Sequence, residues 1–454
     1  MMLQAKIGLA RAAGSLSRRS GRGGTSLPGK LLMRLEPQAI RRLAARLRDG
    51  SAVISATNGK TTTAAMVAAI LEATGARLVH NRAGANMAGG VTTALLDASR
   101  GGSRIDGDAG LFEVDEFWLD QVVPQLHPRA LLLSNLFRDQ LDRYGELEAI
   151  ADRWAAAVAA APATRLVLNA DDPLVADLGR DRARVTYFGV QDDAMALAGM
   201  AHASDSKHCR RCGAPYVYDA IYMGHLGRYH CPNGDGPRPE PGVWATAVKL
   251  DGTRAASFDL HVGGERARVQ LPLPGLYNVY NALGAAALTH ALGASMEAIV
   301  AGLAAMRAAF GRAETVRVGG RELAILLVKN PAGANEVLRT LALDPGEHDV
   351  FAILNDRTAD GHDVSWVWDA DFEKIADRVR RVTCSGTRAA ELALRLKYAG
   401  VPAQRLHVVP DLEAGLDDAL AGGEGRLVAL PTYTAMLELR RLLVARGAAQ
   451  GSFR

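Results

Sequence analysis

The sequence predicts an α/β fold in which a central nucleotide-binding domain of the P-loop type carries a Cys-rich insert and precedes a smaller α/β domain. Three observations lead to this prediction. Short apolar stretches alternate with helical patterns, which is typical of a parallel sheet covered by helices. A Gly-Lys-Thr run stands between the first of these strands and the next helix. The alternation is broken near residue 200 and starts again after residue 315.

Residues 1–49 are predicted to form a basic helical segment. KLLMRLEPQAIRRLAARLR, residues 30–48, has the spacing of an amphipathic helix that Pro37 interrupts. The first fifty residues hold eleven Lys and Arg against two Asp and Glu, whereas the whole chain has a net charge of +4. Such a segment is either a solvated pair of basic helices or a surface that attracts anionic lipid head groups or nucleic acid.

Neither a membrane span nor a secretory signal is expected. No apolar run reaches the length that crosses a bilayer. The start of the chain is basic but lacks the apolar core of a signal peptide. Of the four cysteines three cluster, which favours metal binding over a disulfide framework and a cytoplasmic location over a secreted one.

The central domain is predicted over residues 50–315, with its phosphate loop in SATNGKTTT, residues 55–63. Backbone N–H groups at a helix start attract phosphate, Lys60 adds a positive charge, and Thr61 can bind Mg²⁺. The common loop pattern would place a glycine where this chain has Ile54. A plain helix start is the alternative interpretation.

Three further strands and a hairpin are predicted for this domain. The strands are expected in DAGLFEVDE, PRALLLSNL and TRLVLNADD, residues 108–116, 128–136 and 164–172. ASFDLHVGGERARVQLPLPG alternates apolar and polar residues on both sides of Gly263 and Gly264, which indicates a hairpin. The helical pattern of NVYNALGAAALTHALGA follows it.

An insert of about residues 203–242 is rich in Cys, His, Tyr, Gly and Pro and is expected to lack a core of its own. Cys209, Cys212 and Cys231 have the spacing of a zinc ribbon, but a structural zinc needs four ligands. The fourth position is open between His208, His230 and Asp235. The alternative is a degenerate ribbon that Tyr and Pro packing holds together without metal. Because the insert has no concentrated basic stripe, nucleic acid is not an expected partner.

Residues 316–454 are predicted to form the C-terminal α/β domain. Its strands are expected in RELAILLV, HDVFAILND, RRVTCSG and RLVALP, with helical patterns between them. Cys384 belongs to one of these strands, and we therefore exclude it from the zinc site.

Seven motifs in a fixed order resemble the central ATPase domain of the Mur ligase family. They are TNGKTTT, NRAGANMAGG, FEVDE, NLFRDQLDRYGE, LNADDP, YNVYNALGAA and FGRAE. The loop of this family begins Gly-Thr-Asn-Gly-Lys, which places its first glycine at Ala56 and explains the mismatch at Ile54. Alanine disfavours a positive φ, so the turn at Ala56 is expected to differ from that of the family.

Mur ligases use ATP to phosphorylate a carboxylate, and an amine then attacks the acyl phosphate. The resemblance implies that Lys60, Glu113 and Arg312 take part in catalysis and that Glu113 and Thr61 bind Mg²⁺. It also implies a set of nucleotide-binding residues: Thr57, Asn58, Gly59, Lys60, Thr61, Thr62, Asn278 and Asn281, with Asn169 and Asp172 as weaker candidates. Helix capping is the alternative role for the two asparagines of YNVYNALGAA.

Two positions depart from the amino-acid-adding Mur ligases. Gln140 stands where these enzymes carry a histidine, and Arg153 where they carry a carbamylated lysine. The second Mg²⁺ site must therefore be built differently or be absent. About fifty residues precede the phosphate loop, so a full N-terminal substrate domain is not expected.

The C-terminal half resembles one branch of the family, the ATP-using subunits of lipid II isoglutaminyl synthases. The motifs are KNPAGANEVL, LNDRTADGHDVSWVWDADFE, SGTRAAELALRLKYAGV and LPTYTAMLELRRLL. The resemblance implies that the chain activates the α-carboxyl of D-glutamate in the stem peptide of lipid II. Ammonia from a GatD-like glutamine amidotransferase partner would then give D-isoglutamine. It thus implies peptidoglycan biosynthesis at the inner face of the cell membrane, where a basic N-terminal face is useful.

Lys329 and Asp363 are the site residues that this branch adds. The resemblance implies that Lys329 lies in the active cleft near the phosphates. It also implies that Asp363 of ADGHDVSW reaches the partner's active site, as the third member of a triad with its Cys–His pair. Asp360 and Asp369 are neighbouring candidates for this role, and a helix-capping aspartate is the alternative.

Two other functions compete with this one. A conventional amide ligase, similar to folylpolyglutamate synthase, is disfavoured by ADGHDVSW and by the residues at positions 140 and 153. A non-catalytic scaffold that binds nucleotide and recruits a glutaminase is disfavoured because Lys60, Thr61 and Glu113 are all present.

Overall fold

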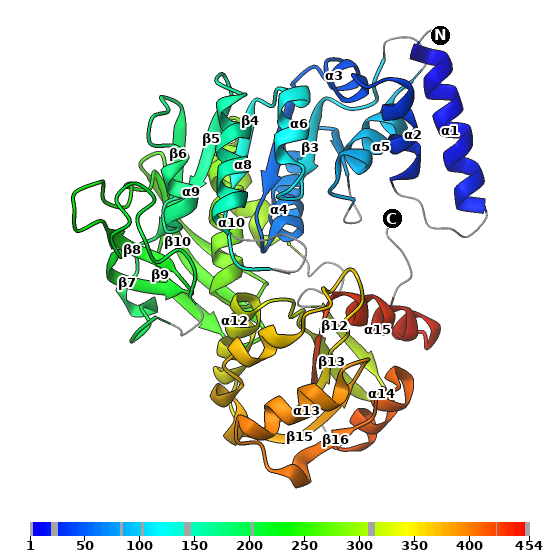
Figure 1. Ribbon diagram of the computed structural model, residues 1–454, viewed down its shortest axis with the longest axis vertical. Coiled ribbons are helices and arrows are strands. Elements are labelled where there is room, and N and C mark those ends of the chain that lie inside the picture. Colours follow the sequence, from blue (N-terminus) through cyan, green and yellow to red (C-terminus); the bar gives the residue numbers. More distant parts are fainter. Residues whose placement is uncertain are drawn as a thin grey trace.

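The computed structural model contains two domains, each built on a mixed sheet, and a two-stranded insert on the first of them (Figure 1). It describes residues 3–19, 26–81, 85–100, 104–139, 147–200, 204–306, 314–423 and 425–449. Arg312 and Gln140 lie outside these described residues. The predicted α/β fold class is confirmed.

The first domain is built on a nine-stranded sheet with the strand order β11-β10-β9-β6-β5-β4-β1-β3-β2. Neighbours from β2 to β9 in this order pair in parallel, and β10 and β11 add an antiparallel edge. All five residues of β1 are buried, as expected for a parallel strand covered on both faces. The strands are β1 Ser51–Ser55, β2 Leu78–His80, β3 Ala109–Glu113, β4 Ala130–Leu133, β5 Arg165–Asn169, β6 Val185–Val190, β9 Val243–Asp251, β10 Ala255–Val262 and β11 Glu265–Leu271.

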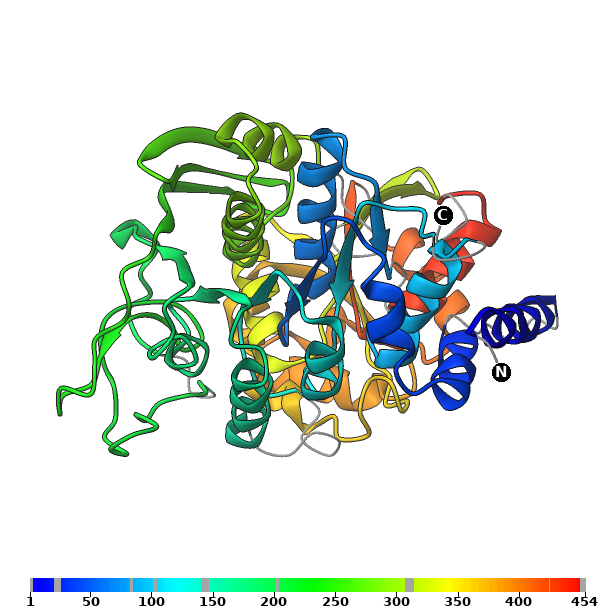
Figure 2. The same ribbon diagram turned by 90° about the horizontal axis from the view of Figure 1, so that it is seen from above.

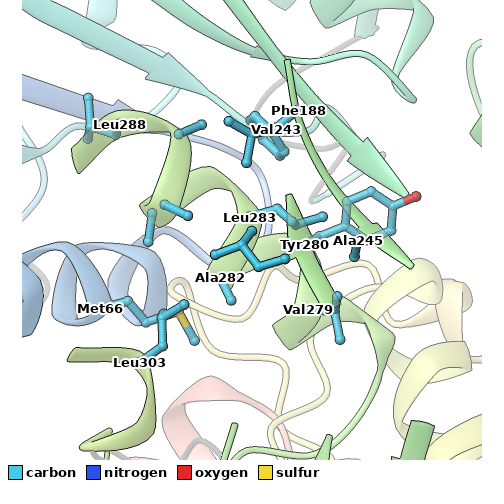
Figure 3. Packing of buried hydrophobic residues seen from close by; sticks show 14 of the residues in the cluster. Met66, Phe188, Val243, Ala245, Val279, Tyr280, Ala282, Leu283, Leu288 and Leu303 are labelled. Atoms are coloured by element: carbon cyan, nitrogen blue, oxygen red, sulfur yellow. The ribbon is translucent and has the colours of Figure 1, made fainter. Parts of the chain in front are cut away.

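Helices cover both faces of this sheet and form two separate cores. One core packs α4, α10 and α11 on the sheet and includes Ile54, Met66 and Leu283 (Figure 3). The other packs α5, α6, α8 and α9 on the opposite face and includes Val53 and Trp154. Val53 and Ile54 are consecutive in β1, so successive side chains of this strand pack into opposite cores. The helices are α4 Lys60–Ala73, α5 Ala88–Ala98, α6 Leu119–Leu126, α8 Leu147–Ala159, α9 Pro173–Asp177, α10 Leu276–Ala291 and α11 Met296–Ala304.

The basic N-terminal segment packs onto the second of these cores. Ile7, Leu32 and Ile40 are buried there. The predicted interruption at Pro37 is confirmed, since it lies between two of the three helices. These helices are α1 Leu3–Arg19, α2 Leu27–Leu35 and α3 Ala39–Ala44. Within the described part of the chain, no helix is long and apolar enough to cross a membrane.

The insert leaves the large sheet after β6 and returns to it as β9. A short 3₁₀-helix, η1 Asp193–Met195, precedes the antiparallel hairpin of β7 Val217–Met223 and β8 Leu226–His230. Buried apolar residues of the hairpin, such as Tyr222, pack into the first core of the central domain. In Figures 1 and 2 the hairpin and α1 lie at opposite ends of the molecule.

The local predictions for this domain hold, with shorter strands. The hairpin at Gly263 and Gly264 is confirmed, since both have positive φ angles of +58° and +86° between paired Val262 and Glu265. The strand predicted over residues 108–116 ends at Glu113. The acidic residues after it leave the sheet at its carboxyl edge, where α/β sheets bind ligands.

The C-terminal domain has a six-stranded sheet with the order β12-β13-β17-β14-β15-β16, parallel except for β12. Helices α12 and α13 pack on one face around Leu338 and Leu392, and α14 and α15 on the other around Leu416 and Leu439. The strands are β12 Glu314–Val318, β13 Arg321–Ile325, β14 His348–Ile353, β15 Val379–Ser385, β16 Leu406–Val408 and β17 Arg426–Pro431. The helices are α12 Pro331–Ala342, η2 Ser365–Asp369, η3 Phe372–Lys374, η4 Ala376–Arg378, α13 Ala389–Tyr398, η5 Ala403–Arg405, α14 Leu412–Ala421 and α15 Tyr433–Ala445.

Candidate active site

The loop between β1 and α4 carries the predicted phosphate-binding residues. Gly59 precedes the helix with a φ of +87°, and a Cβ there would lie 2.0 Å from Oδ1 of Asn281, so only glycine fits. Asn135, which follows β4, clamps the loop: its Oδ1 accepts the N–H of Asn58 at 2.9 Å, and its Nδ2 donates to the Asn58 carbonyl at 3.0 Å. Ala56 does not have a positive φ, so the turn here is made without the conformation that glycine permits.

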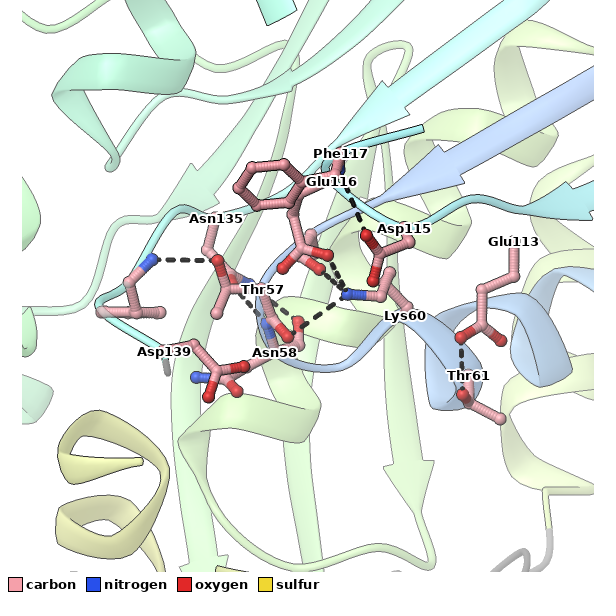
Figure 4. A network of polar contacts seen from close by, with 12 residues as sticks. Thr57, Asn58, Lys60, Thr61, Glu113, Asp115, Glu116, Phe117, Asn135 and Asp139 are labelled. Carbon is pink, nitrogen blue, oxygen red and sulfur yellow. Dashed lines mark hydrogen bonds and ion pairs between the residues drawn. The ribbon is translucent and has the colours of Figure 1, made fainter. Parts of the chain in front are cut away.

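Lys60 points into the loop and is buried (Figure 4). Its Nζ donates to the carbonyl of Ala56 and forms an ion pair with Oε2 of Glu116 at 2.7 Å. Burial alone would lower the pKa of Lys60, but the charges of Glu116 and Asp115 outweigh it, and the pKa is raised. The ammonium group therefore stays charged at the start of α4, where phosphate oxygens would gather.

Thr61 and Glu113 form the pair predicted to bind Mg²⁺. The Thr61 hydroxyl donates to Oε1 of Glu113 at 2.9 Å (Figure 4). Glu113 is the last residue of β3, and Asn81 fixes its backbone through hydrogen bonds of 2.9 Å and 2.7 Å to its N–H and carbonyl. A hydroxyl and a carboxylate side by side are hard oxygen ligands, so this chain's residues fit a magnesium ion.

Two acidic residues of the site, Asp115 and Glu116, were not predicted. Burial and the nearby charge of Glu116 raise the pKa of Asp115. Burial opposes ionisation of Glu116, but the charges of Lys60 and Lys329 lower its pKa. The motif FEVDE contains both residues, and its three acids within five positions were the available signal. Because β3 ends at Glu113, Asp115 and Glu116 lie in the segment after this strand, beside Lys60.

Asn278 and Asn281 lie at the start of α10, opposite the phosphate loop. Nδ2 of Asn281 donates to Oδ1 of Asn278 at 3.0 Å, and Oδ1 of Asn281 accepts the Thr63 hydroxyl at 3.2 Å. Nδ2 of Asn278 donates to the carbonyl of Pro274 at 2.8 Å, which is a local contact at the helix start. Both asparagines also line the large cavity described next.

A cavity of about 500 Å³ lies between the central and C-terminal domains. The predicted residues of the phosphate loop line it, as do Glu113 and Lys329. Its remaining walls include Tyr277 of α10, Met223 of the insert and Glu336 of α12. A volume of this size is typical of a cofactor or small-ligand site.

The C-terminal domain reaches the phosphate loop through two residues before α12. Nζ of Lys329 donates to the carbonyl of Thr57 at 3.0 Å and to Oδ2 of Asp139 at 2.6 Å. Asn330 and Asn58 pair through their side-chain amides at 3.1 Å and 3.3 Å. Asn330 also caps α12, because its Oδ1 accepts the N–H of Gly333 at 2.9 Å. Lys329 thus lies in the cleft.

Three of the residues considered from sequence lie outside the cavity lining. Asn169 is buried and its Oδ1 accepts the N–H of Asp171 at 3.0 Å. Asp172 caps α9 and accepts the N–H of Leu136 at 2.8 Å, which fixes the loop after β4. Arg153 pairs with Asp120 at 2.9 Å.

Asp363 lies on the surface of the C-terminal domain at the start of η2. Its Oδ1 accepts the N–H of Ser365 at 2.8 Å, and hydrogen bonds from Ser365 lower the pKa of its carboxyl. Asp360 differs, because it is buried and accepts the N–H of Thr434 at 2.8 Å. A small cavity of about 70 Å³ separates Asp363 from Lys329 and Asp139, and all three line it.

The cysteines of the insert converge with one carboxylate. The ligand atoms of Cys209, Cys212, Cys231 and Asp235 all lie within 4.8 Å of one another. Burial opposes ionisation of Cys209, but N–H groups of Cys212 and Arg211 lower the pKa of its thiol. His208 and His230 are not part of this group. Three sulfurs and one carboxylate oxygen fit the four-ligand requirement of zinc.

Comparison with known proteins agrees with this geometry. The Mur ligase middle domain family matches residues 54–233, and the MurT ligase C-terminal family matches residues 327–436. A protein of Streptococcus pneumoniae named lipid II isoglutaminyl synthase (glutamine-hydrolyzing) subunit MurT is 34% identical over 451 residues, which are 98% of each chain. The chain belongs to the MurT family. A MurT subunit of Staphylococcus aureus strain N315 is 33% identical over 95% of each chain.

Solved structures share the fold at lower identity. A pseudomurein peptide ligase type C from Methanothermus fervidus has a TM-score of 0.67 and 22% identity, over 89% of this chain and 80% of that one. The MurF ligase of Thermotoga maritima in complex with ADP has a TM-score of 0.62 and 14% identity, over 91% and 85%. The Mur ligase-type architecture predicted from the sequence motifs is thereby confirmed.

Proposed function

We propose that the chain is the ATP-using subunit of a lipid II isoglutaminyl synthase. It phosphorylates the α-carboxyl of D-glutamate in the stem peptide of lipid II, and ammonia then converts the acyl phosphate to D-isoglutamine. The observation that carries this proposal is the meeting of Lys60, the Thr61–Glu113 pair and Lys329 of a MurT-type domain in one cavity. In the first step a carboxylate oxygen attacks the γ-phosphorus and ADP leaves. In the second, ammonia attacks the acyl carbon, phosphate leaves and a proton is released.

The residues of the cleft have separate tasks in this scheme. Lys60 neutralises charge on the phosphate oxygens as the acyl phosphate forms. Thr61 and Glu113 would hold Mg²⁺, which supplies further charge neutralisation when bound. Lys329 already spans Thr57 and Asp139, so it is positioned to join the C-terminal domain to the phosphates as the cleft closes. Arg312 remains a candidate for the γ-phosphate.

The glutaminase partner is proposed to dock on the face of the C-terminal domain that carries Asp363. The C-terminal domain exposes Trp368 of η2 by 50% and Tyr398 of α13 by 72%, with their rings 5.8 Å apart, and Arg395 lies 5.6 Å from the Trp368 ring. Exposed aromatic groups held rigidly by an arginine are typical of interface anchors. Asp363 would complete the triad of a GatD-like partner by orienting its histidine.

Zinc and the membrane complete the proposal. The cluster of Cys209, Cys212, Cys231 and Asp235 is proposed to bind one structural zinc. The basic helices α1 to α3 are proposed to approach the inner face of the cell membrane, where lipid II is embedded. Part of their charge is neutralised internally, since Lys6 and Arg42 both pair with Glu36. The exposed remainder, Lys30 and Arg34 among it, is available to anionic lipids.

One experiment tests the function directly. The chain, co-purified with a GatD-like partner, is incubated with lipid II, ATP, Mg²⁺ and either glutamine or an ammonium salt. We expect ADP release that depends on lipid II, and mass spectrometry of the product should show a hydroxyl replaced by an amine. A conventional amide ligase would instead require an amino acid, and a scaffold would release no ADP.

A further inference from the structure

Glu336 is a buried acid of α12 whose side chain enters the interdomain cavity. It is 5% exposed and lines the cavity together with residues of the phosphate loop. Within the described part of the chain, its Oε2 has no hydrogen-bond partner. A buried polar atom without a partner costs free energy, so its retention on a cavity wall points to a ligand.

The cation nearest to Glu336 is committed elsewhere. Nη1 of Arg339 is 3.9 Å from Oε1 of Glu336, too far for a hydrogen bond. The same guanidinium donates to the carbonyls of Tyr222 at 2.8 Å and Met195 at 3.2 Å, which ties α12 to the insert. Arg339 therefore leaves the cavity side of the carboxyl available.

The wall around Glu336 is mainly apolar. Met223, Leu273 and Val337 line the same cavity, as does the ring of Tyr277. Burial raises the pKa of Glu336 to about 7, although the charges of Arg339 and Lys374 oppose this. Such surroundings suit a flat organic group that offers the carboxyl a hydrogen-bond donor, and they do not suit a phosphate.

The residues along α10 indicate how a nucleotide would lie in this cavity. Phosphates belong at Gly59 and Lys60, beside Asn281. Tyr277 lies one helical turn before Asn281, and it lines the same cavity as Glu336. Burial and the nearby charge of Glu336 raise the pKa of Tyr277. A nucleoside joined to phosphates at the loop and extending along the start of α10 would meet Glu336.

We propose that Glu336 accepts a hydrogen bond from the nucleoside part of ATP, either from a ribose hydroxyl or from the exocyclic amine of adenine. This inference rests on the proposed use of ATP and adds a residue that selects the nucleotide. Carboxylates recognise ribose hydroxyls in other nucleotide sites, and the amine of adenine is a donor of similar reach. Glu336 acts in binding and takes no part in the transfer of the phosphoryl group.

Titration calorimetry of the full chain with Mg²⁺ tests the proposal. The probes are ADP, 2′-deoxy-ADP, 3′-deoxy-ADP, IDP and tripolyphosphate. We expect Glu336→Leu to weaken ADP binding by about tenfold, as loss of one hydrogen bond to a buried acid implies. Whichever analogue lacks the contacted donor should bind the parent more weakly than ADP, and this difference should vanish in the variant. The identity of that analogue distinguishes ribose from adenine.

Tripolyphosphate and a matched variant provide the controls. Tripolyphosphate reaches only the phosphate loop, so Glu336→Leu should bind it as the parent does. Glu391→Gln changes a half-buried acid of α13 that pairs with Arg388 and does not line the cavity, and it should bind every probe like the parent. If Glu336→Leu binds ADP as tightly as the parent, or loses tripolyphosphate equally, the inference fails while ATP use stands. If the parent binds neither ADP nor tripolyphosphate, the proposed function fails with it.

Discussion

The interdomain cavity has two ends, which we call the phosphate end, around Lys60 and Lys329, and the nucleoside end, around Glu336. At the phosphate end, Lys60 and Lys329 each lie within 2.7 Å of a carboxylate oxygen. At the nucleoside end, Oε2 of Glu336 lacks a hydrogen bond among the described residues. The two ends differ in how the cost of burying a charged group is offset. At the phosphate end burial opposes the charge of Lys60, but the counter-charge of Glu116 outweighs it and raises the pKa of this lysine. Burial raises the pKa of Glu336 to about 7, because the charges of Arg339 and Lys374 offset only part of the cost of ionising a buried carboxyl.

This difference teaches how each end can respond to a ligand. On binding phosphate, the lysines at the phosphate end would exchange one set of anionic oxygens for another, so binding there would need little reorganisation of the protein. The acid at the nucleoside end gains a partner that it did not have. In our proposal the first end would supply most of the catalytic effect, and the second would supply selection among nucleotides.

The largest expected effect on activity comes from removing the lysine at the phosphate end. Lys60→Ala should reduce amidation at least about 1,000-fold, even with a high concentration of ammonium, because the acyl phosphate would form without its fixed positive charge. The measurement is amidated lipid II by mass spectrometry. Lys249→Ala, an exposed lysine of β9, is the control. Substantial ammonia-driven activity in Lys60→Ala would remove the lysine from the assigned role.

A second variant asks whether the partner's site is separate from the phosphate end. Asp363→Asn should lower glutamine-driven amidation about 100-fold or more, since an amide cannot stabilise the partner's imidazolium. Ammonia-driven amidation should largely survive, because the proposed ATP site is the larger cavity, which Asp363 does not line. Asp369→Asn, at the other end of η2 from Asp363, should leave both activities unchanged. Equal loss of the two activities in Asp363→Asn would place Asp363 in the ligase site instead.

Variants of the proposed zinc ligands test whether the insert contributes to nucleotide binding. One zinc per chain is expected by metal analysis, absent in Cys209→Ser and reduced in Asp235→Asn. Because Met223 at the end of β7 lines the cavity, zinc loss should also weaken ADP binding severalfold. Cys384→Ser, a buried cysteine of the other domain, should keep its zinc. Full zinc in Cys209→Ser would exclude the cluster, and full zinc in Asp235→Asn would exclude the carboxylate as a ligand.

A fourth variant tests the raised pKa of Glu336 through the pH dependence of protein stability. The pKa of Glu336 is raised from 4.5 to about 7 in the folded protein, so folding loses stability as the pH rises through this range and stays weaker above it. Glu336→Gln should therefore be more stable than the parent at pH 8, by up to about 3 kcal/mol, and little different at pH 4.5. Urea unfolding at both pH values measures this. A gain that does not depend on pH would contradict the assigned titration.

The smallest expected effect lies away from both ends. Replacing Lys30 and Arg34 by glutamine should weaken action on lipid II in anionic liposomes by about tenfold or less, and salt should reduce the difference. Activity on detergent-solubilised lipid II should not change, since neither residue contacts the cavity. If liposome activity is the same as that of the parent at low and high salt, the basic helices are only a solvated face.

Elements that depend on neighbouring residues were predictable from the sequence. The strand, loop and helix around Lys60, the break at Pro37 and the hairpin at Gly263 each follow from local spacing, and each is present. The ends of elements were less predictable, since β3 stops at Glu113 and sends two further acids to Lys60. A strand boundary depends on pairing with the next strand, which the sequence of one segment does not contain.

By itself the sequence determined the fold class and the succession of strand, loop and helix around Lys60, because these three elements are contiguous in the chain. The tertiary structure alone decided which distant groups meet. Lys329 reaches Asp139 across 190 residues, Asp235 rather than a histidine joins the three cysteines, and Glu336 enters the cavity beside Tyr277 without a hydrogen bond to Oε2. These contacts depend on how two separate sheets and an insert pack together, and burial then sets the pKa of each acid. Local spacing carries no record of that packing.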